Sequence, residues 1–109
     1  MKDRAIARIY SERAGDPELE EALEQFVLGL AEQIDHLQDV QVAADLEGLA
    51  KLAADLARDA QALGYPQLAK AALAIAEAAR RLDSNGVLDR VRELTELGYR
   101  IRLGHRGAF

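Results

Sequence analysis

The chain has 109 residues, half of them apolar, with a formal net charge of −5 and no cysteine. This length fits one domain with a single core, and the lack of cysteine excludes disulfides and thiolate metal sites. The acidic balance argues against broad binding to nucleic-acid phosphates, and no apolar run approaches the roughly 20 residues of a membrane span. We therefore expect one cytoplasmic domain over residues 1–109, with neither a nucleic acid nor a membrane as partner.

The composition is typical of helices, and no strand-like alternation occurs along the chain. A short first helix is predicted over residues 2–13. Its apolar side holds Ile6, Ile9 and Tyr10. A second helix is predicted over residues 17–39, because Asp16 suits the N-cap and Pro17 the first helical position. Its apolar stripe consists of Leu19, Leu23, Phe26, Val27, Leu30, Ile34 and Leu37.

The second half of the chain predicts three more helices. Asp45 is the expected cap of a helix that ends at Gly64. Its inward face consists of Leu46, Leu49, Leu52, Ala53, Leu56, Ala60 and Leu63. Pro66 opens a helix to residue 82, and "LDSNG" at 82–86 predicts a turn. The helix before that turn carries Leu68, Ala72, Ile75, Ala79 and Leu82, and the helix after it carries Val87, Leu88, Val91, Leu94, Leu97 and Ile101.

These elements define the predicted fold class, which is all-α. Four long amphipathic helices with short connections favour an antiparallel up-down four-helix bundle over residues 17–103. The helix at 2–13 would be a short addition to this bundle, and residues 104–109 a flexible tail.

One face of the helix at 45–63 points away from the leucines. At 100° per residue, Ala54 and Arg58 lie opposite the inward face. We call the set around them the alanine strip; it consists of Ala50, Lys51, Ala54, Ala57, Arg58 and Gln61. From the residues alone, the strip is either a solvated surface filled with the best helix former or a shallow docking face.

The order of elements resembles the histidine-containing phosphotransfer (HPt) domain of bacterial phosphorelays. The signature of that family is Ala-His, any residue, an aliphatic residue and Lys-Gly, followed by a Gly ten residues after the His. This chain reads "AADLAR" over 53–58, with Gly64 ten residues after Ala54. The flanking stretches "FVLGLAEQIDHL" and "DLEGLAKLAADL" resemble the helices that surround the family's His, so that the resemblance covers residues 10–103.

The resemblance implies a four-helix bundle whose phosphorylated His stands exposed on a long helix, and here the chemistry of that site is missing. Ala54 replaces the His, Ala57 the Lys that holds the phosphoryl charge, and Arg58 the Gly that lets a partner approach. A methyl group is no nucleophile toward an aspartyl phosphate. The expected function is therefore that of a degenerate, non-enzymatic member. It would bind the receiver domain of a response regulator through the helices at 17–39 and 45–63 and the alanine strip, without carrying phosphate.

The sequence leaves other interpretations open. The alanine-rich helix at 66–82 would suit a structural or homo-oligomeric bundle, because small residues permit close packing between chains. The expected oligomeric state is a monomer or a weak homodimer. An active phosphotransfer protein could use His36, whereas His105 falls in the predicted tail. Asp55 and Asp59 form a lone carboxylate pair, so no metal and no cofactor are expected.

Overall fold

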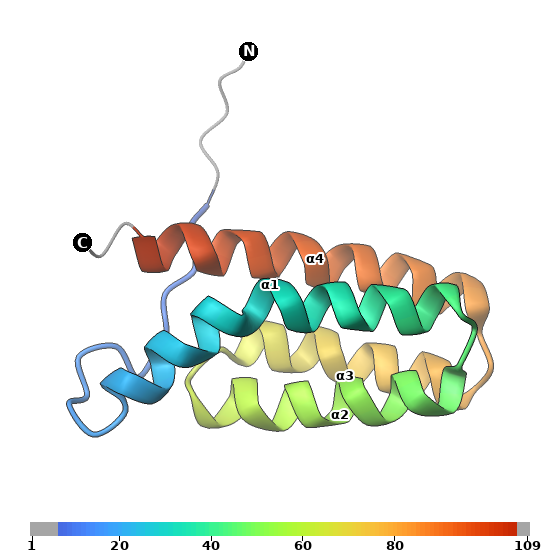
Figure 1. Ribbon diagram of the computed structural model, residues 1–109, viewed down its shortest axis with the longest axis horizontal. Helices are drawn as coiled ribbons and strands as arrows, with labels where there is room; N and C mark the ends of the chain where they lie inside the picture. Colours follow the sequence, from blue (N-terminus) through green and yellow to red (C-terminus); the bar gives the residue numbers. More distant parts are fainter. Residues whose placement is uncertain (1–6, 107–109) are drawn as a thin grey trace, which may run out of the picture.

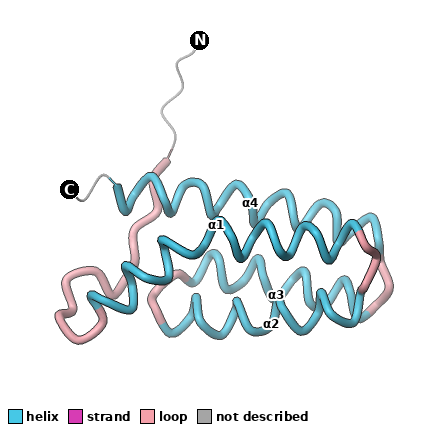
Figure 2. Tube along the Cα trace, viewed as in Figure 1, coloured by secondary structure: helices cyan, strands magenta, loops and turns pink. Residues whose placement is uncertain are grey.

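The computed structural model describes residues 7–106, and this part of the chain forms four helices and no strand (Figures 1 and 2). The helices are α1 (Glu20–Val42), α2 (Leu46–Ala62), α3 (Pro66–Arg80) and α4 (Ser84–Arg106). The connections between consecutive helices lie at alternate ends of the structure (Figure 1). Both α1 and α3 contact α2 and α4, so the four helices surround one core. The prediction of an all-α, four-helix protein is confirmed.

The core is made of the apolar stripes that the sequence predicts. Its largest fully buried side chains are Leu30, Leu37, Leu49, Leu68, Ile75, Leu94, Ile101 and Val87. The prediction was wrong for Leu82, which is 74% exposed, and for Leu88, which is 38% exposed. Leu82 follows the end of α3 with a φ of +59°, a left-handed conformation that turns the chain away from the helix axis.

Alanines make up much of the buried faces of α2 and α3, and these two helices contact each other more extensively than any other pair. The buried alanines on the two helices are Ala50, Ala53, Ala57 and Ala60 on α2 and Ala69, Ala71, Ala72, Ala76, Ala78 and Ala79 on α3. Methyl side chains let two helix axes approach to the short end of the usual interaxial range. We call this contact the α2–α3 seam.

Two aspartates start helices by capping them. The Asp45 carboxylate accepts a hydrogen bond from the Gly48 backbone N–H at 2.9 Å, which confirms the predicted cap of α2. Asp83 accepts one from the Gly86 N–H at 3.0 Å in the same way. The predicted turn over 82–86 is therefore wrong in its second half, because residues 84–86 already form the first turn of α4.

Asp16 does not cap α1. Its carboxylate accepts a hydrogen bond from the Glu18 N–H at 3.0 Å, and its carbonyl accepts one from the Leu19 N–H. These bonds hold residues 17–19 in turns, a local alternative to the helix that aspartate often offers. As a result α1 begins at Glu20, three residues later than predicted, and runs on to Val42.

The predicted helix at 2–13 is wrong for residues 7–13, and residues 2–6 lie outside the described part. The segment hydrogen-bonds to α4 and to the residues that follow α2. The Ile9 N–H donates to the Arg100 carbonyl at 3.1 Å, and the Ser11 hydroxyl donates to the Leu63 carbonyl at 2.5 Å. Because its backbone groups find partners in this way, the segment needs no helical bonds of its own.

The predicted flexible tail begins too early, because residues 104–106 continue α4. Gly104 is buried where the N-terminal segment crosses α4, and a Cβ there would collide with the carbonyl oxygen of Ile9. Glycine at this position therefore permits close contact between two backbones. The rest of the predicted tail, residues 107–109, lies outside the described part.

Candidate functional site

The alanine strip is only partly accessible. Lys51, Arg58 and Gln61 are exposed and Ala54 is partly exposed, as expected of a surface. The prediction was wrong for Ala50 and Ala57, which are only 7% and 4% exposed. They are buried because α3 packs so extensively on α2 that the contact face of α2 is wider than its leucine stripe.

The accessible members of the strip border the α2–α3 seam. Ala50, Ala54, Ala57 and Gln61 follow one another at helical spacing, so they form a line along one edge of α2. At the start of this line, Ala50 and Lys51 line a shallow groove together with residues of α3. At Ala54 the edge of α2 presents only a methyl group, so no long side chain rises at the position where the resemblance places a His.

Two cations flank Ala54 on the outer face of α2. The Arg58 guanidinium lies 3.6 Å from a carboxylate oxygen of Asp55 and 3.4 Å from one of Asp59. The Arg58 side chain is 72% exposed, and such ion pairs in water contribute little. Lys51 is exposed and makes no ion pair within residues 7–106. Both side chains can therefore turn toward an acidic partner at small cost.

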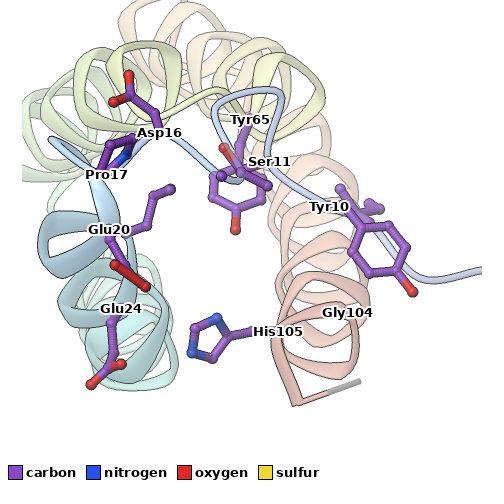
Figure 3. Close-up of a pocket in the computed structure, with 13 residues that line it drawn as sticks. Tyr10, Ser11, Asp16, Pro17, Glu20, Glu24, Tyr65, Gly104 and His105 are labelled. Carbon is purple, nitrogen blue, oxygen red and sulfur yellow. The ribbon is translucent and has the colours of Figure 1, made fainter. Parts of the chain in front are cut away.

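The structure gives the two histidines different surroundings. His36 is exposed on α1 and takes part in no ion pair within the described part of the chain. His105 lies in the last turn of α4, not in a flexible tail, and its side chain extends into the space between α4 and α1 (Figure 3). Within residues 7–106, no group of three or more His, Cys, Asp or Glu side chains could hold a metal ion. None of the described helices is long and apolar enough to cross a membrane.

A pocket of 380 Å³ that the sequence does not predict lies at the end of the structure where the N-terminal segment crosses (Figure 3). Its walls come from that segment, from the start of α1 and from the end of α4. Tyr65, between α2 and α3, lines it and stacks on Phe26 with ring centroids 5.8 Å apart. The sequence feature that could have pointed to this pocket is an aromatic residue between Gly64 and Pro66. This pattern is too short to predict a pocket whose wall is formed by a non-helical segment.

Burial gives Tyr65 a pH-dependent role in stability. It raises the pKa of the Tyr65 phenol above the value of about 10 for an unfolded chain, because the charged form is poorly solvated there. The contribution of the neutral phenol to the free energy of unfolding is therefore fully present below pH ~10. It is lost as the pH rises through the pKa of Tyr65 in the folded protein. We expect Tyr65→Phe to reduce the alkaline loss of unfolding free energy, measured by urea unfolding at a series of pH values. Tyr10→Phe is the matched control, since Tyr10 is exposed, and an unchanged alkaline loss in Tyr65→Phe would contradict the prediction.

The chain was compared with protein-family models, with curated proteins and with solved structures, and none of the three comparisons finds a match.

Proposed function

We propose that the chain is a degenerate HPt-like protein that binds the receiver domain of a response regulator and does not carry phosphate. One observation carries this proposal. The outer face of α2 presents the partly exposed Ala54, with the cations Lys51 and Arg58 beside it. Bound there, the protein would sequester the regulator or compete with an active relay protein.

Charge supports a receiver domain as the partner. A receiver domain accepts phosphate on an aspartate, so the surface that it brings to a phosphotransfer protein is acidic. Lys51 and Arg58 would meet that surface with opposite charge, which favours encounter and orientation. On the same face Asp55 and Asp59 pair with Arg58, so Lys51, which makes no described ion pair, is the cation most available to such a partner.

The geometry of α2 also supports binding without phosphotransfer. At the position of the family's His, Ala54 offers no nitrogen to accept a phosphoryl group. The position of the family's Lys is Ala57, which faces the α2–α3 seam instead of the solvent. Arg58 fills the space that the family's Gly leaves open. The three replacements each remove a different part of the phosphotransfer chemistry, and Ala54 remains partly exposed to a partner.

The course of the chain agrees with the proposed fold type. Connections at alternate ends (Figure 1) support an antiparallel up-down arrangement, as in the family. The alternative of a homo-oligomer built on α3 loses its main argument, since the alanines proposed for contacts between chains are buried against α2 and α4 of the same chain.

A charge reversal on α2 tests the docking surface. We expect Lys51→Glu/Arg58→Glu to weaken binding of the cognate receiver domain at least about tenfold, because both reversed charges would then face an acidic surface. Calorimetry gives the dissociation constant, and chemical shifts of the labelled protein give the surface. The matched control is Lys70→Glu/Arg81→Glu, which makes the same change of charge on exposed residues of α3 and the loop after it.

Two results would refute parts of the proposal. If a receiver domain leaves the amide shifts of Lys51, Ala54, Arg58 and Gln61 unchanged, the docking surface is wrong. If a phosphorylated receiver transfers stable label to the chain, the claim that it carries no phosphate is wrong. Loss of that label in His36→Gln would then assign the reaction to His36, the accessible histidine of α1.

A further inference from the structure

A second surface lies between α1 and α4, away from the alanine strip. It is a groove that gathers exposed apolar side chains: Val42 of α1 is 80% exposed, and Leu88 and Tyr99 of α4 are 38% and 42% exposed. A hydrogen bond from the Gln38 side-chain amide to the Thr95 hydroxyl, at 2.9 Å, joins the two helices across it. We call this surface the α1–α4 groove.

The groove carries two opposite charges that have no described partner. Arg92 and Glu96 both line it and are exposed. They are four residues apart on α4, yet neither takes part in an ion pair within residues 7–106. Such a groove offers a partner apolar contact area together with charges of both signs that could set its orientation.

The order of these residues along α4 is self-complementary. It reads apolar, cation, anion, apolar at Leu88, Arg92, Glu96 and Tyr99. When two copies of such a face pair antiparallel about a twofold axis, the first residue meets the last and the second meets the third. One register satisfies both pairings, with the twofold axis between residues 93 and 94. Leu88 then faces Tyr99 of the other copy, and Arg92 faces the position next to the other copy's Glu96.

The stripe has the length and spacing of a helix–helix contact. Leu88, Arg92, Thr95, Tyr99 and Arg102 follow one another at intervals of three and four residues and all line the groove. From Leu88 to Arg102 this is about 21 Å along α4, at 1.5 Å per residue. The Arg102 guanidinium lies over the Tyr99 ring at 5.9 Å from its centroid, which holds the ring on the surface.

We infer that the α1–α4 groove is the interface of a twofold homodimer, in which α4 of one copy lies antiparallel on α4 of the other. Leu88 and Val42 of each copy pack on Tyr99 of the other, and two Arg92–Glu96 ion pairs form across the axis. The two ion pairs fix the register, and the apolar contacts supply the affinity.

The dimer leaves the alanine strip on α2 free. In the ring of four helices α2 contacts α1 and α3 but not α4, so α2 and α4 lie diagonally opposite. Each dimer would therefore present two alanine strips on its outer sides. The inference does not depend on the proposed function, since it concerns other residues and a different partner.

Reciprocal charge reversal tests the interface. Wild-type protein should show a concentration-dependent monomer–dimer equilibrium in sedimentation equilibrium. Arg92→Glu places two glutamates opposite each other, and Glu96→Arg two arginines, so each variant should have a dimer dissociation constant at least about tenfold higher. When the two variants are mixed, a heterodimer can form both ion pairs with reversed sign. We expect the mixture to recover the dimer, as should the double variant Arg92→Glu/Glu96→Arg by itself.

Controls separate this effect from net charge and from misfolding. Lys70→Glu on α3 and Glu32→Arg on α1 make the same changes of charge at exposed positions outside the groove and should dimerise as the wild type does. Circular dichroism should show that all variants are folded, since only exposed side chains change. Val42→Asp is a second probe, which should weaken the dimer by placing a charge at the apolar end of the groove.

Three results would overturn the inference. The first is a wild-type protein that stays monomeric up to millimolar concentration. The second is a dimer that both single variants retain, which would place the interface elsewhere. The third is a mixture of the two variants that stays monomeric. Antiparallel pairing of α4 requires the mixture to form a heterodimer. In the first case the groove would be left to a different partner, and in the third the two copies would meet through it in a different pairing.

Discussion

Replacing Gly64 by alanine is expected to lower the free energy of unfolding by about 3 kcal/mol, a large share of the stability of a domain of this size. Two costs add. Gly64 has a φ of +84°, where a residue with a Cβ is strained, and that Cβ would lie 2.8 Å from the backbone nitrogen of Arg13 and 2.7 Å from the Ser11 hydroxyl. The chain cannot relax by moving a side chain alone, because the Glu12 N–H donates to the Gly64 carbonyl at 2.8 Å. Urea unfolding monitored by circular dichroism measures the loss.

Gly29→Ala is the matched control for this prediction. Gly29 lies inside α1, and a Cβ there would meet nothing within 4 Å. The same substitution should therefore stabilise the protein by about 0.5 to 1 kcal/mol, the gain in helix propensity from glycine to alanine. Equal effects at the two positions would mean that the N-terminal segment does not rest on Gly64 in solution.

The parts of the fold that the sequence predicts are those that depend on one helix at a time. Leu30, Leu49, Ile75 and Leu94 repeat at helical spacing with their neighbours, and all are fully buried. Asp45 lies immediately before a periodic stretch and caps it. In each case the local pattern and the tertiary contact favour the same conformation, so the pattern alone is enough.

The errors occur where a contact between distant segments decides the conformation. Residues 7–13 have enough apolar residues to suggest a helix, yet the carbonyl groups of Leu63, Gly64 and Arg100 take their hydrogen bonds. The end of α4 was predicted as a tail because Gly104 weakens the pattern. Instead this glycine lets the N-terminal segment cross α4. A one-dimensional pattern contains no information about either crossing.

The candidate site shows the same limit within a single helix. Projection at 100° per residue assumes that a helix has one buried direction, and on that assumption Ala50 and Ala57 belong to the surface. α2 has two neighbours, α1 on its leucine side and α3 on its alanine side, and the second contact buries both residues. Only the members of the strip that lie outside both contacts, Lys51, Ala54, Arg58 and Gln61, are accessible to a partner.

The boundary between seam and surface falls between two adjacent alanines, which allows a sharp test. Ala53 is completely buried and Ala54 is partly exposed, on the same helix one residue apart. We expect Ala53→Leu to lower the free energy of unfolding by about 3 kcal/mol, because α2 and α3 lie too close to admit three more carbon atoms without moving apart. Ala54→Leu should change it by no more than about 0.5 kcal/mol, as is usual for a surface position.

The same pair of variants connects the seam to the docking surface. Ala54→Leu leaves the fold intact but raises a branched side chain above the surface between Lys51 and Arg58, so it should weaken receiver binding although the protein is as stable as the wild type. Thermal unfolding and calorimetric titration of both variants separate the two effects. If Ala54→Leu destabilises the protein as strongly as Ala53→Leu, then Ala54 belongs to the α2–α3 seam, and the surface on which the proposed docking rests does not exist.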